Sequence, residues 1–600
     1  MAIRVNKLLS ELNIGLATFE SMLNTLGYKE DVLTPNSKIP EDIAILVKNY
    51  FSEGADFFKL VKAVADRGVY GSKVDSTPLL KVVGRIDLDE LNTTKRVKEQ
   101  KSTRFNDNIL NTPELVYNEK PTFWICELAM LSPEKEVNSI EIGAFDDAGG
   151  LPLYSLLIGT NGAGKSSMMK EIVDFFIDLH SCVNDSEPKL TGANKGRLKG
   201  IRYHIDGMEI GIVRIEKGFA AIVDGHFRNL KEIRLPSVVA CHFGAFDKLP
   251  TQTVNGSSQT RYDVPCYKYV GAHVNGSMIS SSAIAFRLLF ALNEKMNDRQ
   301  RGNIRSILDF IGYDHRISLS YSLVLKAKKD GSAKNNIVKR VENDREYSRL
   351  NSKEKNEIIT QLYNFYRSKT TTGNARHDYD VDFDSSSTSG GAIAELQYIY
   401  KLKQCDLVSS TNVIFHKQGS DITSEELSSG EFAMLSTVLS ISAAASDPHT
   451  LVLLDEPELS LHPNWQMTLI DNLDRALANR VCHLLIATHS HMLVSDLPMK
   501  RSAVTQIEKD GRGNLYATTI PDSTYGWSAE EVLLKVFKTA TDRNRFFGER
   551  IGKLLEQMGN NTISPKEVKV ELKELQEISM HLSDVDPMKM ILNTIVETYE

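Results

Sequence analysis

The stretch from Leu153 to Leu179 reads LYSLLIGTNGAGKSSMMKEIVDFFIDL, and it decides the fold. Its first six residues are an apolar run typical of a buried strand, and the residues after Ser167 have the apolar spacing of a helix. Between them, GTNGAGKS fits the pattern G-x-x-x-x-G-K-[ST] at every fixed position. A strand, a glycine-rich turn and a helix in this order predict a parallel α/β sheet whose loop binds phosphate.

The glycine-rich loop supplies most of the predicted nucleotide-binding residues. Its glycines let successive backbone N–H groups point at phosphate oxygens, and the following helix adds about half a positive charge at its N-terminus. Lys165 is expected to reach the β- and γ-phosphates, and the Ser166 hydroxyl to ligate Mg²⁺. The residues predicted to bind the nucleotide here are Gly159, Asn161, Gly162, Ala163, Gly164, Lys165, Ser166 and Ser167.

A second informative stretch, LVLLDE, runs from Leu451 to Glu456. A strand buried in a parallel sheet is apolar throughout, and ligands bind at the carboxyl ends of such strands. We therefore expect Asp455 to hold Mg²⁺, directly or through water, and Glu456 to polarise the attacking water as a general base. Alone, an Asp-Glu pair is equally consistent with an ordinary surface position.

Three further motifs stand in a fixed order around this strand. LSSGE (427–431) precedes it, and ELSLHP (458–463) and the pair His489-Ser490 follow it. Together with the glycine-rich loop, this order resembles the Walker A, signature, Walker B, D-loop and switch-histidine motifs of ATP-binding-cassette (ABC) ATPases, over about residues 120–510. The resemblance implies an α/β fold: an ABC-type P-loop ATPase head with an antiparallel β subdomain, helical insertions and small helical N- and C-terminal parts.

The resemblance also implies a mechanism. In such ATPases ATP and Mg²⁺ are buried between two protomers, so we expect a homodimer or a higher homo-oligomer. Ser428, Ser429 and Gly430 would then contact the γ-phosphate bound to the other protomer, through the N-terminus of the helix that follows them. His489 would sense the same phosphate. The predicted catalytic residues are Lys165, Glu456 and His489.

Two positions of the signature depart from the family pattern. Ser429 stands where a second glycine is usual, and Glu431 stands where glutamine is usual. A side chain in a tight space and a negative charge near the triphosphate both predict slow ATP hydrolysis. The family's Q-loop glutamine has no match, and the segment VVACHFGAFDKL (238–249) occupies the expected place, which makes Asp247 and Lys248 candidates for coupling.

Within the ABC ATPases the chain most resembles the stand-alone ATPases of anti-phage defence operons, the PtuA family of Septu-type systems. The distance of 261 residues from Ser166 to Leu427 is far more than a transport cassette usually needs, and the absence of sustained heptads in it disfavours the long coiled coils of SMC-type proteins. The 111 residues after His489 show no Toprim nuclease domain of the OLD type. The stretches that carry the resemblance are GTNGAGKSS, FGAFDKL with YKYVG (267–271), LSSGE, DEPELSLHP, ATHSHMLVSDLP and TYGWSAEEVLLKVF (524–537).

This resemblance implies a sensor and regulatory subunit that converts ATP and water to ADP and phosphate and works with a separate HNH-type nuclease. One alternative is a DNA-repair or chromosome-maintenance ABC ATPase that clamps DNA directly. Another is a scaffold whose nucleotide stabilises assembly without turnover. The basic runs Lys95–Arg104 and Lys326–Arg349 leave DNA open as a further ligand, although solvated runs of this kind are common.

Composition narrows the class of protein. The 71 Lys and Arg against 78 Asp and Glu give a net charge of −7, which excludes a globally basic nucleic-acid coat. Six scattered cysteines without a C-x-x-C pair favour thiols in a reducing cytosol over a disulfide framework or a zinc site. No run approaches the roughly 18–20 apolar residues of a membrane helix. We therefore expect a cytoplasmic protein without a membrane partner.

Changes in composition and in apolar spacing along the chain predict four parts. The expected parts are a small helical N-terminal module (1–60), a linker or helical connection (61–119), an ABC-type ATPase domain (120–520) and a C-terminal helical region (521–600). An insertion of about residues 186–425 separates the glycine-rich loop from the signature. Within it, residues 326–390 are charged and then rich in Ser, Thr and Gly, which predicts exposed loops.

Overall fold

The computed structural model divides the chain into two compact units, residues 1–526 and 527–600. Of the residues predicted to bind the nucleotide, Asn161 lies outside those that the structure describes. The structure describes all residues except 1, 13, 27, 29–32, 54–55, 67–116, 118–120, 146–149, 161, 185–189, 191–195, 217, 245–246, 253–260, 275–276, 279–283, 287–288, 290–297, 330, 344–349, 372–375, 385–389, 418–419, 446, 479, 522, 538–544, 561, 580–586 and 600.

A seven-stranded sheet forms the centre of the larger unit, in the order β11-β10-β18-β19-β5-β20-β21. Its first six strands are parallel, and β21 runs antiparallel to β20. The three middle strands are buried along their whole length, which explains why they read as continuous apolar runs. The strands are β5 (Leu153–Ile158), β10 (Ser237–Cys241), β11 (Tyr267–Tyr269), β18 (Thr450–Asp455), β19 (Cys482–Ala487), β20 (Ser502–Lys509) and β21 (Leu515–Ile520).

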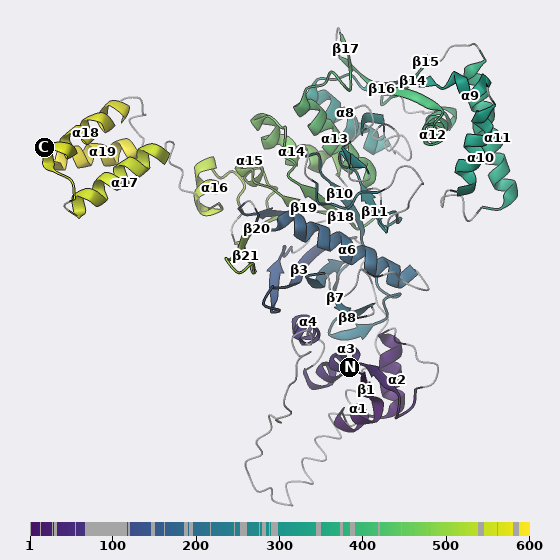
Figure 1. Ribbon diagram of the computed structural model, residues 1–600, viewed down its shortest axis with the longest axis horizontal. Helices are drawn as coiled ribbons and strands as arrows, with labels where there is room; N and C mark the ends of the chain where they lie inside the picture. The colour runs from purple at the N-terminus through teal and green to yellow at the C-terminus, as the bar shows by residue number, and fades with distance from the viewer. Residues whose placement is uncertain are drawn as a thin grey trace, which may run out of the picture. The chain divides into compact units, whose positions relative to one another are not determined.

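A second sheet, of six antiparallel strands in the order β4-β3-β6-β7-β8-β9, faces the central sheet across helix α6 (Lys165–Asn184). Side chains of α6 and of both sheets form one hydrophobic core. Figure 1 shows α6 on one side of the central sheet and the helices α13, α14 and α15 on the other. This arrangement confirms the predicted ABC-type α/β fold with its antiparallel β subdomain. The bounds are β3 (Phe123–Leu131), β4 (Val137–Glu141), β6 (Leu198–Ile205), β7 (Met208–Ile215), β8 (Gly218–Val223), β9 (His226–Arg228), α13 (Ser429–Ala444), α14 (Pro463–Ala476) and α15 (His491–Ser495).

His483 on β19 ties the two sheets together. Its side chain is fully buried; Nδ1 accepts a hydrogen bond of 3.1 Å from the Ile125 N–H of β3, and Nε2 lies 2.9 Å from the Ser155 hydroxyl oxygen of β5. Protonation would set a ring N–H against the Ile125 N–H in a fully buried site. Burial accordingly lowers the pKa of His483 from 6.5 to about 3.

We expect His483 to make the protein less stable as the pH falls below about 6.5. Because its folded pKa lies below its unfolded pKa, the contribution to stability is complete above the unfolded value of 6.5 and is lost towards about 3. The loss is up to about 1.4 kcal/mol per pH unit. In thermal melting between about pH 7.5 and pH 5.5, His483→Gln should melt lower than the parent at the higher pH but lose less on acidification. An equal loss in both proteins would contradict the assignment.

The N-terminal helices pack on the outer face of the antiparallel sheet and share a hydrophobic core with it. Helix α4 approaches closely because the strands carry glycine beneath it: a Cβ at Gly200 would lie 2.7 Å from Val61, and one at Gly211 would lie 2.8 Å from Phe57. Phe57 and Val61 therefore pack directly on the strands, and the N-terminal module covers this face of the antiparallel sheet. The bounds are β1 (Ala2–Arg4), α1 (Val5–Leu12), α2 (Leu16–Thr25), β2 (Lys38–Pro40), α3 (Glu41–Glu53) and α4 (Phe57–Asp66).

The insertion carries a four-stranded antiparallel sheet in the order β15-β14-β16-β17, with helices beside it. The prediction of exposed loops over 326–390 is wrong for most of this segment. Asn351 and Glu354 form a capping box that begins α11, and Ile359, Leu362 and Tyr366 are its buried face. The bounds are β12 (His273–Val274), β13 (Ser277–Met278), α8 (Asp298–Ile311), β14 (Arg316–Leu323), α9 (Leu325–Lys329), α10 (Ser332–Asn343), α11 (Ser352–Thr370), β15 (Arg376–Asp382), α12 (Gly390–Gln404), β16 (Val408–Lys417) and β17 (Ser420–Thr423).

The smaller unit, residues 527–600, is helical in its described parts and has a core of its own. Leu554, Leu575 and Leu592 meet in that core, one from each of its three longer helices. In the described residues of the whole chain, no helix combines the length and the apolar character needed to span a bilayer. The helices of this unit are α16 (Ala529–Lys535), α17 (Arg545–Gly559), α18 (Pro565–Ser579) and α19 (Pro587–Tyr599).

Candidate nucleotide-binding site

The candidate site lies where neighbouring parallel strands end. The glycine-rich loop follows β5, His489 follows β19 and Glu456 follows β18. Strand β19 pairs in parallel with both β5 and β18, so these three ends lie side by side at one edge of the sheet. This edge is where open α/β sheets bind their ligands.

Two features of the glycine-rich loop require glycine. A Cβ at Gly159 would lie only 2.2 Å from the Ile507 carbonyl oxygen of β20, so a larger residue could not follow β5 here. Gly162 and Gly164 have φ values of 82° and 99°, a region that side chains rarely adopt. Ser167 is exposed in the first turn of α6, which begins at Lys165, and Ala163 of the loop is buried.

The Lys165 side chain turns back onto the glycine-rich loop. Its ammonium group donates to the Gly159 carbonyl and to Nε2 of His489, each at 2.9 Å. Burial lowers the pKa of Lys165, and the nearby carboxylates of Glu456, Asp455 and Glu458 oppose that shift. Burial and the charge of Lys165 lower the pKa of His489, which favours the neutral imidazole that accepts this hydrogen bond.

Asp455 and Ser166 offer the oxygen donors that Mg²⁺ prefers. Asp455 is 2% exposed, and Ser166 hydrogen-bonds its carboxylate. Burial raises the pKa of Asp455, the Ser166 hydrogen bond lowers it, and the charge of Glu456 raises it further. Its Oδ1 is buried and has no hydrogen-bond partner among the described residues. A buried carboxylate oxygen without a partner is costly unless a cation faces it, so these residues fit the metal that the motif implies.

Glu456 has a left-handed backbone, with a φ of 49° that is rare for a side chain larger than glycine's. Its N–H donates to the Ala487 carbonyl at 2.8 Å, so the strained turn is held by the neighbouring strand β19. Strain of this kind is concentrated at functional sites, because a special direction of the side chain must be fixed. The half-buried Glu456 lies close enough to Lys165 and His489 to affect the pKa of both.

Glu458, the first residue of ELSLHP, is a residue of this site to which the sequence analysis assigned no role of its own. Its Oε1 accepts a hydrogen bond of 2.6 Å from the backbone N–H of His489 and so fixes the turn that carries the histidine. Burial raises the pKa of Glu458; the hydrogen bond from His489 lowers it, and the charge of Glu456 raises it further. Only its position two residues after Glu456 could have suggested this role from the sequence.

The signature residues lie on the exposed start of α13. Ser428 and Ser429 are exposed, whereas Gly430 is buried, and a Cβ on it would lie 3.0 Å from the Trp465 ring of α14. Ser428 caps the helix: its hydroxyl oxygen accepts from the Glu431 N–H at 3.2 Å. The Ser428 hydroxyl in turn donates to the Glu431 carboxylate at 2.8 Å, and the role of this turn in binding a phosphate stays a prediction.

Glu431, the departure from the family pattern, is folded back onto this turn. Its Oε2 accepts from the Ser428 N–H at 3.0 Å, and its Oε1 accepts from the Tyr313 hydroxyl at 3.1 Å. Burial acts to raise the pKa of Glu431, but the hydrogen bonds from Ser428 and Tyr313 outweigh it and lower the pKa. The carboxylate therefore stays charged at the signature, held by a tyrosine of the insertion.

Glu431→Gln is expected to strengthen ATP-dependent dimerisation. The amide keeps one oxygen for the Ser428 N–H and can donate its NH₂ to the Tyr313 hydroxyl oxygen, but it removes a negative charge near the predicted γ-phosphate position. Two unit charges about 4 Å apart in water repel by about 1 kcal/mol, so the dimer should tighten by about fivefold at low salt. Light scattering with ATP measures this, with Glu426→Gln, an exposed glutamate bonded to Thr423, as the control. A dimer that is unchanged or weaker would contradict the prediction.

The two candidates for coupling, Asp247 and Lys248, differ in their surroundings. Asp247 accepts hydrogen bonds from the Leu249 N–H at 2.7 Å and from the Tyr269 hydroxyl, which gives it a structural role in this loop. Lys248 is exposed. The residue of this segment that reaches the site is His242, whose Nδ1 lies 2.9 Å from the Asp455 carbonyl oxygen.

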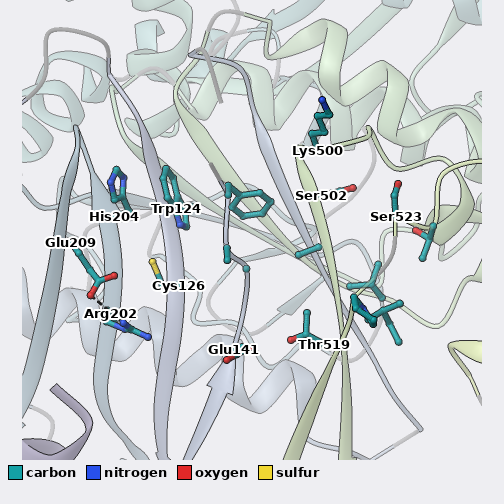
Figure 2. Close-up of a pocket in the computed structure, with 18 residues that line it drawn as sticks. Trp124, Cys126, Glu141, Arg202, His204, Glu209, Lys500, Ser502, Thr519 and Ser523 are labelled. Carbon is teal, nitrogen blue, oxygen red and sulfur yellow. Dashed lines mark hydrogen bonds and ion pairs between the residues drawn. The ribbon is translucent and has the colours of Figure 1, made fainter. Parts of the chain in front are cut away.

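A cavity of about 670 Å³ lies elsewhere, between the antiparallel sheet and β20–β21 (Figure 2). Trp124 and His204 stack along one side of it, with ring centroids 3.9 Å apart, and Arg202 pairs with Glu209 at 3.1 Å. Ser502 on the other side begins β20 and pairs with the first residues of β5. The cavity therefore lies at the opposite edge of the sheet from the glycine-rich loop and is not part of the candidate site.

The sheet order and the motifs at its strand ends define an ABC-type P-loop ATPase head. The family model described as "AAA domain, putative AbiEii toxin, Type IV TA system" matches residues 298–496. This range includes the signature, the Walker B strand and the switch histidine.

Similarity to curated proteins is confined to short segments. The chain is 28% identical over 127 residues to the "Retron Vc95 probable ATPase" of Vibrio cholerae, covering 20% of this chain and 24% of that protein. It is 29% identical over 108 residues to the "Septu protein PtuA" of Bacillus thuringiensis, covering 18% of this chain and 26% of that protein. The chain thus resembles defence-associated ATPases, and the matches span about a quarter of the length of these relatives.

Solved structures of SMC heads also match. The Smc head domain of Pyrococcus furiosus bound to the C-terminal domain of ScpA is 11% identical, and the match covers 66% of this chain and 96% of that chain with a TM-score of 0.28. For the SMC head domain from Thermotoga maritima the identity is 9%, the coverage 67% and 99%, and the TM-score 0.26.

Proposed function

We propose that this chain binds and hydrolyses Mg²⁺-ATP as the sensor and regulatory subunit of a cytoplasmic anti-phage defence complex, together with a separate HNH-type nuclease. The observation that carries the ATPase part is the cluster of Lys165, Glu456 and His489 at the ends of three adjacent strands. The resemblance to PtuA and to a retron ATPase supports the defence role.

The residues of the cluster suggest how turnover would proceed. Lys165 would leave the Gly159 carbonyl and His489 and turn to the β- and γ-phosphates, since its present partners are weaker than a phosphate anion. Glu456 would take the proton of the attacking water, while His489, released by Lys165, would face the γ-phosphate. When bound between Ser166 and Asp455, Mg²⁺ would neutralise charge on the phosphates.

Completion of the site would require a second copy of the chain. The exposed turn of Ser428, Ser429 and Gly430 offers donors at a helix N-terminus, which suits a phosphate held by another protomer. We therefore include a homodimer or higher homo-oligomer in the proposal. Only the ATP-bound state would hold two copies together. The partner nuclease would therefore be regulated by the ATP-dependent dimerisation of this chain.

The defence role is tested first by reading the neighbouring open reading frame, where we expect an HNH-type nuclease, and then in cells that carry both genes. We expect the pair to reduce phage plating, each gene alone to give no protection, and Lys165→Ala in the pair to abolish it. A purified chain that cleaves DNA strongly by itself, even as Lys165→Ala, would overturn the proposal. Tight, salt-dependent duplex binding by the chain alone would favour the alternative of a DNA-clamping repair ATPase, since phosphate contacts release counterions.

A further inference from the structure

His242 lies beside Asp455, the candidate metal ligand, and one of its ring nitrogens has no hydrogen-bond partner among the described residues. His242 directly follows β10, the parallel neighbour of the Walker B strand β18, and is 2% exposed. Its Nδ1 lies 2.9 Å from the Asp455 carbonyl oxygen. A carbonyl oxygen only accepts, so Nδ1 carries the proton. Nε2 is buried and has no hydrogen-bond partner among the residues that the structure describes.

The backbone around His242 is fixed from the side of β11. The Ala272 N–H donates to the His242 carbonyl at 2.9 Å, and the Tyr269 hydroxyl oxygen lies 3.4 Å from the same carbonyl oxygen. Gly271 allows this approach, because a Cβ there would lie 2.2 Å from the same carbonyl oxygen. A Cβ at Gly244 would lie 2.6 Å from Nε2 itself. Gly271 thus permits the close approach to the His242 backbone, and Gly244 permits the close approach to Nε2.

Buried polar atoms in native proteins almost always have a partner, and a missing one is supplied by water, an ion or a ligand. Two such atoms occur together here, Nε2 of His242 and Oδ1 of Asp455, on residues that are joined by a hydrogen bond. One is an acceptor on a ring and the other an acceptor on a carboxylate. A cation with its coordinated water satisfies both, because the cation faces the carboxylate and the water donates to the nitrogen.

We propose that His242 is a positioning residue for the Mg²⁺ that accompanies ATP: Nε2 accepts a hydrogen bond from a water molecule of the metal's shell, and the hydrogen bond from Nδ1 to the Asp455 carbonyl orients the ring. The inference rests on the proposed function, since it requires Mg²⁺-ATP at Asp455 and Ser166. Residues that orient a metal's shell in this way change metal affinity or activity by about 10–100-fold when they are replaced.

Two amide variants test the contributions of Nδ1 and Nε2 of His242 separately. In His242→Asn the amide nitrogen can replace Nδ1 as the donor to the Asp455 carbonyl, but nothing replaces Nε2. In His242→Gln the longer side chain places a polar atom nearer the position of Nε2. His180→Asn is the matched control, because His180 bonds the Pro236 carbonyl at 2.9 Å, outside the site. Thermal melting of each variant shows whether it is folded.

The readout is the Mg²⁺ concentration that gives half-maximal binding of a fluorescent ATP analogue, measured in the Glu456→Gln background so that no nucleotide is consumed. We expect His242→Asn to raise this concentration by about tenfold or more, with His242→Gln close to the parent and His180→Asn unchanged. In the hydrolysing protein, His242→Asn should lower kcat more than it changes KM, and His242→Gln should restore much of kcat.

An unchanged Mg²⁺ requirement in a folded His242→Asn would overturn the inference and leave the proposed function standing, because a structural water would then be the partner of Nε2. Loss of Mg²⁺-dependent binding in both His242 variants, with both folded, would also overturn it. The polar atom that His242→Gln places near the position of Nε2 would then contribute nothing to Mg²⁺ binding. A Glu456→Gln parent that binds no nucleotide at all would instead remove the proposed function, and this inference with it.

Discussion

Glu456→Gln should stop ATP hydrolysis and make an ATP-bound dimer accumulate. The amide has nearly the shape of the carboxylate but cannot take a proton from the attacking water. General-base catalysis is worth about 10²–10⁴-fold, so phosphate release should fall by at least about a hundredfold. Nucleotide binding should persist, because Lys165, Ser166 and the backbone of the loop are unchanged. Phosphate release and light scattering with and without ATP measure the two effects on one sample.

The same variant distinguishes an enzyme from a scaffold. A scaffold that uses its nucleotide only for assembly would behave the same with glutamine at this position. The matched control is Glu508→Gln, which changes a glutamate on β20 that has a hydrogen bond with Gln506. Unchanged turnover in Glu456→Gln would show that another group activates the water.

Lys165→Ala should abolish nucleotide binding and, with it, dimerisation. Lys165 would make charge-assisted hydrogen bonds to two phosphates, and each such bond is worth about 1.5–3 kcal/mol. A loss of about 3 kcal/mol or more weakens affinity by more than about a hundredfold. Titration of a fluorescent ATP analogue measures the change.

The control for Lys165→Ala lies on the same helix. Lys170 of α6 pairs with Asp174 at 2.7 Å, so Lys170→Ala removes an equal charge one turn and a half away without touching the loop. We expect it to bind nucleotide as the parent does. If both variants lost binding equally, the general charge of α6 and not the position of Lys165 would be responsible.

Much of the fold could be predicted from short, contiguous patterns. The glycine-rich loop and the Leu451–Glu456 strand each contain their own strand, turn and chemistry, so a local reading places them at the carboxyl end of a parallel sheet. The predicted α/β head is confirmed on this basis. The roles of the individual site residues remain predictions, since binding and turnover test them.

The rest of the site depends on contacts between distant parts of the chain. His242 and Asp455 are 213 residues apart, and Tyr313 and Glu431 are 118 residues apart. No local pattern marks such a pair, because its members belong to different elements that meet only in the folded sheet. In the insertion, by contrast, a local sequence signal for a helix was present. Asn351 and Glu354 have the spacing of a capping box and could have predicted the start of α11, although the high charge of the segment favoured loops.

The glycines beneath helix α4 have a consequence for how the protein is made. The helices of the first 66 residues pack on strands that end only at Arg228, so the ribosome must add about 160 more residues before that surface exists. At about 5–20 residues per second this takes roughly ten to thirty seconds. Until the strands with Gly200 and Gly211 have been made, Phe57 and Val61 have no groove to enter, so their apolar side chains stay without their native partners during this part of synthesis.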